Sequence, residues 1–253
     1  MQIVNITDCQ GSNAELRLNL RINSLFHDAK VEHTGVSSPL EAGGNIIDSL
    51  DAVLPGAPCI IMANIAPRGN KDKYPNGAPF CFAYFENNIV IGTPETFSIL
   101  KKFGLVSKIN ETDVLTVCKK FLDKSEANRI TNSQFRSYEY LPRLAKWLSD
   151  KKEVPFKEIE IPALAGNYVW CTDRFTEDPD EKVNCKTTAL EISEITNQVL
   201  SKLPFYERLT DVPKNEAAIV RGSSGYKNRR FLEVVIQGGS AAKTFGLKVG
   251  SNV

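Results

Sequence analysis

The chain has 253 residues, of which 42% are apolar and 24% charged, a composition typical of a soluble globular protein. Its 31 basic and 30 acidic residues leave a formal net charge of +1. Because neither sign predominates, the composition argues against a nucleic-acid or anionic-membrane partner and favours a small molecule.

Neither targeting nor metal binding is expected from the sequence. No apolar run approaches the roughly 20 residues that span a bilayer, and residues 1–10 carry neither a basic nor an apolar leader region. The six cysteines form no CxxC pair and there are only two histidines, so a zinc site has few candidate ligands. We expect a cytoplasmic protein with reduced core or near-core thiols and no metal.

Strand and helix patterns alternate in the first part of the chain. Residues 3–8 form a short β-branched run, and residues 14–26 follow with leucines and isoleucines at helical spacing. A second helix is predicted over 43–54 and an almost wholly apolar strand over 57–67. This alternation predicts a parallel or mixed sheet.

The patterns that follow extend the same domain. Residues 79–86 and 87–94 are predicted to form a β-hairpin around a tight turn. Helical spacing then recurs in three segments: 96–105, 114–124 and 140–150. Together these elements predict an α/β domain with a mixed, mostly parallel sheet, over residues 1–158.

Beyond residue 158 the chain changes to short β-type runs separated by turns. The runs cover 166–175, 217–225 and 229–239, and they predict a small β-rich domain over residues 159–253. Residues 188–203 could form a helix within it, although their periodicity is ambiguous.

Three polar residues near predicted strand or helix ends are candidate ligand contacts. Asp8 follows the first strand, where a carboxylate can accept two hydrogen bonds from a ribose diol or, alternatively, cap a helix. Arg68 follows the strand over 57–67 and suits a substrate carboxylate, or else an exposed turn. Arg136 begins a helical segment, where it could bind an anion or, alternatively, belong to a charged and solvated first turn.

The β-rich domain offers aromatic and small residues. Trp170 and Phe175 could stack a purine or belong to the core, and the small residues of 237–250 permit close approach of a flat ligand or a tight turn. No GxGxxG after the first strand, Walker sequence, HExxH or GxSxG is present, which weakens the dinucleotide, triphosphate, zinc-protease and hydrolase interpretations.

The end of the chain resembles a known family. Phe231-Leu232-Glu233, then Gly239-Ser240-Ala241-Ala242, then Leu247, Val249 and Gly250 are similar to the closing segment of the S-adenosylmethionine (SAM) hydroxide adenosyltransferases and the SAM-dependent chlorinases and fluorinases. Asp173-Arg174-Phe175 resembles the family's D-x-F-G-N turn, with Asn184 in place of its asparagine. The opening ITDCQ and residues 37–43 agree in order.

The resemblance implies a fold, a ligand and an assembly. It implies that residues 159–253 form a β-barrel and that SAM is a substrate, with no cofactor, held between one subunit's first domain and a neighbour's second in a homotrimer. The residues it assigns to SAM or adenosine are Asp8 and Asn13 for the ribose, Phe175 and Asn184 for the adenine, and Ser240, Ala241 and Ala242 for the adenine edge.

The turns that carry catalysis in the family depart from its pattern. Ala66 and Arg136 stand where hydrolytic members have the aspartate and histidine that activate water, and Ala66 does not match the halogenases' residue either. Arg68 and Arg136 remain as candidate catalytic groups, able to hold an anion or the methionine carboxylate but not to act as bases. We expect cleavage of SAM at the ribose C5′ carbon, with water favoured over halide. The alternatives are a non-catalytic SAM or adenosine binder and elimination chemistry.

Overall fold

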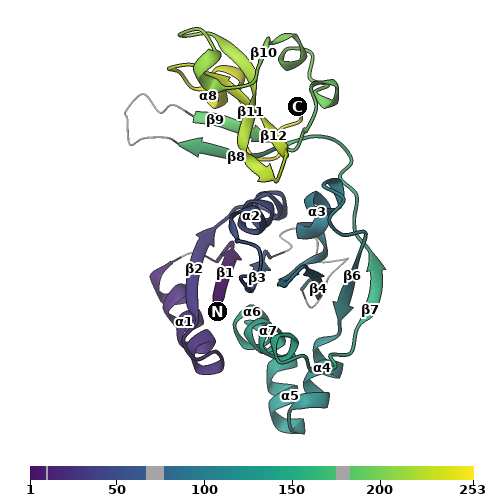
Figure 1. Ribbon diagram of the computed structural model, residues 1–253. Coiled ribbons are helices and arrows are strands. Elements are labelled where there is room, and N and C mark those ends of the chain that lie inside the picture. The colour runs from purple at the N-terminus through teal and green to yellow at the C-terminus, as the bar shows by residue number, and fades with distance from the viewer. Residues whose placement is uncertain (10, 67–76, 175–182) are drawn as a thin grey trace. The chain divides into compact units, whose positions relative to one another are not determined.

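The chain forms two compact units, Met1–Ala163 and Leu164–Val253 (Figure 1). This computed structural model describes residues 1–9, 11–66, 77–174 and 183–253. The first unit continues past residue 158 because strand β7 (Lys157–Glu160) pairs with β6 (Lys108–Thr112) in its sheet.

A seven-stranded mixed sheet forms the middle of the first unit, in the order β2-β1-β3-β5-β4-β6-β7. The parallel half consists of β2, β1, β3 and β5, and the antiparallel half adds β4, β6 and β7. The remaining strands are β1 (Gln2–Thr7), β2 (Lys30–Gly35), β3 (Cys59–Asn64), β4 (Phe80–Phe85) and β5 (Asn88–Gly92).

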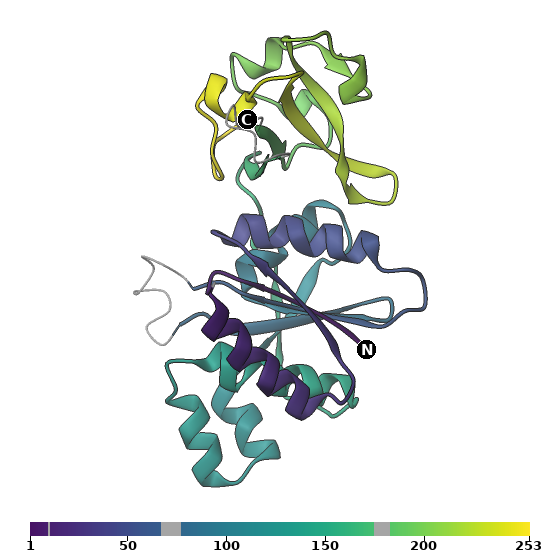
Figure 2. The ribbon, with the colours of Figure 1, turned by 90° about the vertical axis from the view of Figure 1, so that its left-hand side faces the viewer.

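Helices cover both faces of this sheet (Figure 2). Helix α1 packs with α6 and α7 on one face, and α2 packs with the 3-10 helix η1 and α3 on the other. The helices are α1 (Ser12–Leu25), α2 (Pro39–Ala52), η1 (Pro94–Phe97), α3 (Ser98–Lys102), α4 (Val114–Phe121), α5 (Lys124–Thr131), α6 (Arg136–Glu139) and α7 (Leu141–Ser149). None of the helices in the described ranges is long and apolar enough to span a bilayer.

Local sequence explains where several helices begin. The side chain of Ser38 accepts a hydrogen bond from the Glu41 backbone N–H at the start of α2, and Asp113 and Asp123 cap α4 and α5 in the same way. Strand β2 was not predicted from the sequence, because its segment KVEHTG contains no apolar run. The strand lies at the edge of the sheet and is partly exposed.

The connections around β1 create a crevice. From β1 the chain crosses through α1 to β2 on one side, and then through α2 to β3 on the other side of β1. Right-handed crossovers in opposite directions place their helices on opposite faces, so the chain diverges at the carboxyl ends of β1 and β3. Ligands of open α/β sheets bind at such a point.

The second unit contains a five-stranded sheet in the order β10-β11-β12-β9-β8. The strand order ends at β10 on one side and at β8 on the other, where the backbone of Val169 also hydrogen-bonds with Gly250 and Ser251. Closure of this sheet into a barrel stays a prediction. Its elements are β8 (Val169–Arg174), β9 (Val183–Thr187), β10 (Phe205–Tyr206), β11 (Ala217–Tyr226), β12 (Arg229–Ile236), the 3-10 helices η2 (Ile192–Glu194), η3 (Leu200–Lys202) and η4 (Leu209–Asp211), and α8 (Ala241–Phe245).

The helix considered over 188–203 is wrong. The segment holds only η2 and η3, because the side-chain oxygen of Asn197 accepts hydrogen bonds from the backbone N–H groups of Val199 and Leu200. An asparagine that caps a new turn in this way competes with a continuous helix.

A buried carboxylate joins four helices of the first unit. Glu139, at the end of α6, accepts hydrogen bonds from both terminal nitrogens of Arg129 at 3.0 Å and from Arg143 at 3.2 Å, and its carboxylate lies 3.4 Å from Arg21 of α1. The hydrogen bonds from Arg129 lower the pKa of Glu139. Burial of the carboxylate acts in the opposite direction, and the positive charge of Arg21 lowers the pKa further. The four side chains, from α1, α5, α6 and α7, are called the Glu139 cluster below.

Replacement of Glu139 by glutamine should destabilise the protein by about 3 kcal/mol at pH 7, because three arginines would lose a buried counter-charge. Since the folded-state pKa is lowered, the wild-type advantage should be complete above the ordinary carboxyl pKa and should disappear as the pH falls through the lowered value. Urea unfolding between pH 3 and pH 7 measures this.

The matched control is Glu158→Gln, which breaks an exposed pair with Lys108 at 2.7 Å. Because solvent screens this exposed pair, the variant should lose much less stability than Glu139→Gln. Equal losses for the two variants, or a Glu139→Gln loss that does not change with pH, would contradict the proposed importance of the cluster.

Candidate functional site

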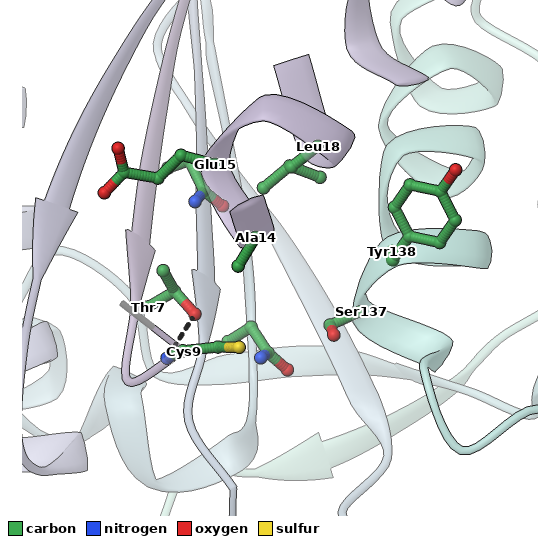
Figure 3. Close-up of a pocket in the computed structure, with 9 residues that line it drawn as sticks. Thr7, Cys9, Ala14, Glu15, Leu18, Ser137 and Tyr138 are labelled. Carbon is green, nitrogen blue, oxygen red and sulfur yellow. Dashed lines mark hydrogen bonds between the residues drawn. The ribbon is translucent and has the colours of Figure 1, made fainter. Parts of the chain in front are cut away.

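Two cavities that share Asn64 and Ser137 lie at the carboxyl ends of β1, β3 and β5. The β1 cavity has a volume of about 40 Å³ and is lined by Asn5, Thr7, Cys9, Ala14, Glu15, Leu18, Asn64, Ser137 and Tyr138 (Figure 3). The β3 cavity, of about 160 Å³, is lined by Asn64, Ile65, Ala66, Gly77, Ala78, Phe80, Thr93, Gln134, Arg136 and Ser137.

Strand alternation places the lining of the β1 cavity on one face of the sheet. Asn5 and Thr7 share a face with Ile3, which belongs to the core beneath α1 and α7. Figure 3 shows Ala14 of α1 and Ser137 of α6 around the same space as Thr7. The cavity therefore lies on the α1 face of the crevice.

Two buried polar atoms in these cavities have no partner in the described parts of the chain. Across those parts, three buried side-chain polar atoms lack a hydrogen bond: Asn5 Oδ1, Thr93 Oγ1 and Trp170 Nε1. Asn5 lines the β1 cavity and Thr93 the β3 cavity. Since buried polar groups in proteins are nearly always hydrogen-bonded, these two atoms are the polar groups in the two cavities that still lack a partner in the described fold.

Asp8 joins the ends of the two strands that border the crevice. Its Oδ2 accepts a hydrogen bond from the Ala66 backbone N–H at 3.1 Å, and its own N–H donates to the Asn64 carbonyl at 3.3 Å. The carboxylate predicted to hold a ribose thus links the ends of β1 and β3, and Asp8 lines neither cavity.

Arg136 brings a positive charge to the β3 cavity. It is the first residue of α6, it is half-buried, and it has no acidic partner within the described residues. Burial lowers the pKa of its guanidinium, which nevertheless stays charged because arginine does not lose its proton in proteins. Gly77 has φ +82°, and a Cβ there would collide with this guanidinium. A partly desolvated cation in this position favours an anionic ligand group.

The other predicted site residues have different positions. Asn13 is exposed in the first turn of α1 and lines neither cavity. Arg68 and Phe175 lie outside the described residues.

Four predicted residues belong to the second unit. Asn184 is buried in β9 opposite Asp173 of β8. Ser240 caps α8, where its Oγ accepts a hydrogen bond from the Lys243 N–H at 3.2 Å. Ala241 is part of the core, and Ala242 packs against it. These residues have evident structural roles within their own unit.

Trp170 is a core residue rather than an exposed stacking face. Its side chain is 1% exposed, and its ring centroid lies 5.3 Å from that of Phe231.

Four of the six cysteines are buried, as expected of core thiols, whereas Cys9 is exposed. The buried ones are Cys59, Cys81, Cys118 and Cys185. Burial raises the pKa of Cys59 and Cys118 to about 11 and that of Cys185 to about 12, so these thiols are inert. Within the described residues no group of His, Cys, Asp or Glu is arranged to hold a metal ion.

Sequence reasoning did not single out Asn5 and Thr93. The signal for Asn5 was present, because an asparagine interrupts the β-branched run IVNIT in a strand that is otherwise apolar. No comparable signal marks Thr93, whose position in the site depends on the pairing of β5 with β3.

Comparison with known structures identifies the fold. No protein-family model and no curated protein matches the sequence. An uncharacterized conserved protein from Thermotoga maritima has a TM-score of 0.63 at 13% identity, and a conserved hypothetical protein from Thermus thermophilus has a TM-score of 0.60 at 14% identity. Both alignments cover 98% of this chain and 97% of the other. At this identity the likeness establishes a shared fold.

Replacement of Thr93 by valine should leave the free energy of unfolding unchanged or raise it by up to about 1 kcal/mol, because the variant loses a buried hydroxyl without a partner in the described fold. The control is Thr112→Val, since Thr112 Oγ1 donates to the Phe80 carbonyl at 2.7 Å and accepts from Tyr140 Oη at 3.0 Å. That variant should lose about 1 to 3 kcal/mol in urea unfolding. A comparable loss in Thr93→Val would mean that its hydroxyl has a partner within the fold.

Proposed function

We propose that this protein binds S-adenosyl-L-methionine at the crevice of its first unit and cleaves it at the ribose C5′ carbon with water, giving adenosine and L-methionine. One observation carries the proposal. Ala66 and the pair Arg136 and Ser137 come from the two turns that stand in the places of the family's reactive turns, and they line the same cavity although they are far apart in the sequence. Their meeting in one cavity is what the resemblance requires of these two turns.

The site supplies positioning and charge. A water oxygen attacks C5′ as the C5′–S bond breaks, the sulfonium takes the electron pair and becomes the thioether of methionine, and the released proton passes to solvent. The sulfonium is already a good leaving group, so holding the reactants in line in a partly dry crevice supplies much of the acceleration. Arg136 is suited to the methionine carboxylate.

A non-catalytic SAM or adenosine binder is the second candidate. The described lining of the β3 cavity contains no carboxylate and no imidazole, so it offers no general base for water. Attack by a halide ion in place of water needs no base, so halogenation is a further alternative in the same site. Elimination to methylthioadenosine is another.

The β-barrel, the homotrimer and the cytoplasmic location are further proposals that rest on the family resemblance or on sequence composition. Sedimentation analysis of the purified protein tests the trimer, and a monomeric mass would oppose it.

The proposed function is tested by incubating the purified protein with SAM, with and without chloride. All adenosine-containing products are then identified by mass spectrometry. Adenosine with methionine is expected. 5′-Chloroadenosine or methylthioadenosine would reassign the reaction, whereas unchanged SAM with calorimetric binding would favour the binder. Unchanged SAM without binding would reject the proposal.

Replacement of Arg136 by glutamine should weaken SAM binding about 10- to 100-fold, the effect of losing a charge-assisted hydrogen bond, and should leave adenosine affinity unchanged. Calorimetry with both ligands measures this. The control is Lys108→Gln, which removes an exposed positive charge from β6 and should alter neither affinity. If the Arg136 variant binds SAM as well as the wild type does, the carboxylate does not lie at Arg136.

The double variant Ala66→Asp with Arg136→His tests the alignment of the two turns. It places an acid and an imidazole in one cavity, as in the hydrolytic members of the family, and should raise the hydrolysis rate at saturating SAM. If the variant binds SAM and shows no hydrolysis, the equivalence of these turns with the family's is wrong.

A further inference from the structure

Asn5 is a buried asparagine in the middle of a parallel sheet. Its side chain is 1% exposed, and its Cα is paired in register with that of His33 on β2. Side chains in register on neighbouring strands share a face, so the amide and the imidazole meet beneath α1. An asparagine at such a position reduces stability unless each of its polar atoms has a partner.

A chain of hydrogen bonds fixes the orientation of the Asn5 amide. His33 Nε2 lies 2.8 Å from Asn19 Oδ1 of α1 and donates its proton to this oxygen. In a neutral imidazole the other nitrogen, Nδ1, is then an acceptor, and it lies 3.1 Å from Asn5 Nδ2. Asn5 therefore directs its N–H toward His33 and leaves Oδ1 as an unfilled acceptor.

Neither neighbouring hydroxyl that lines the cavity donates to Asn5 Oδ1 in this structure. Thr7 Oγ1 accepts a hydrogen bond from the Cys9 N–H at 3.1 Å, and the hydroxyl of Tyr138 accepts one from Arg21 at 3.3 Å. Asn5 Oδ1 has no partner among the residues that the structure describes, and Asn5 lines the β1 cavity. At about 40 Å³ this cavity admits one small polar group of a larger ligand.

We propose that Asn5 is a specificity-determining residue that accepts a hydrogen bond from a hydroxyl or amino group of the ligand, and that His33 is a positioning residue that orients the Asn5 amide. The proposal selects ligands with a hydrogen-bond donor at the end that enters the β1 cavity. It rests on the proposed function only for the identity of that ligand, since SAM carries both hydroxyl and amino donors.

The first test needs no ligand. Nitrogen-15 NMR at pH 8 should show the neutral His33 imidazole with its proton on Nε2. The chain has only two histidines, so His27→Gln assigns the spectrum. A proton at Nδ1 would reverse the hydrogen-bond chain, present Nδ2 of Asn5 to the cavity, and overturn the proposal.

The second test separates a ligand contact from a structural role. Asn5→Leu should bind SAM about tenfold more weakly than the wild type. It removes an unsatisfied buried acceptor but also the hydrogen bond to His33 Nδ1, so its urea midpoint is compared with that of His33→Leu, which loses the same hydrogen bond. His33→Leu should weaken binding as well, because the amide is no longer held. A lower urea midpoint with unchanged SAM affinity for Asn5→Leu would make Asn5 structural only and would leave the proposed function standing.

The third test works even if SAM does not bind, a result that would reject the proposed function. Ethylene glycol, which has hydrogen-bond donors, should shift the side-chain amide resonances of Asn5, and 1,2-dimethoxyethane, which has none, should not. In the wild type, ethylene glycol should also shift the side-chain amide resonances of Asn64, which lines the same cavity. In the Asn5→Leu variant this shift of the Asn64 resonances should be absent. Equal shifts with the two probes, or none with either, would refute donor recognition by Asn5.

Discussion

The carboxylate of Glu139 is the interaction on which the site depends. Helix α6 has four residues and no side-chain cap at its start, so it cannot be stable by itself. It is held because Glu139 at its end is bound by arginines from α1, α5 and α7. Arg136, Ser137 and Tyr138 precede Glu139 on the same turn, and the positions of these lining residues follow from this buried charge.

The crossover pattern of the sheet provides the second constraint. The chain leaves β1 in one direction and returns past it in the other, which opens a crevice at the carboxyl ends of β1 and β3. Asp8 ties these two ends together through Ala66. Both cavities lie where the strands end, and each contains one buried polar atom that the described part of the fold leaves without a partner.

The chemistry of the described site is that of binding and orientation. Arg136 contributes a half-buried positive charge, and Asn5 and Thr93 offer hydrogen-bonding atoms, but the described lining of the β3 cavity supplies no base. Such a site suits a ligand that is intrinsically reactive, such as a sulfonium, because the protein then needs only to align it with a nucleophile. The same features suit a binder, and product analysis distinguishes the two.

The sequence by itself determined the alternation of strands and helices, the hairpin of β4 and β5 and the change to a β-rich second unit, because apolar periodicity and turn residues are local signals. It also singled out Arg136 and the turn at Ala66. Only the tertiary structure brought these two together. Only it showed β2, whose polar sequence reflects its position at the edge of the sheet. It also showed 3-10 turns over 188–203, where Asn197 ends the helical pattern. The unfilled acceptor at Asn5 Oδ1 was equally hidden, because it depends on the strand register and on His33, which no local pattern encodes.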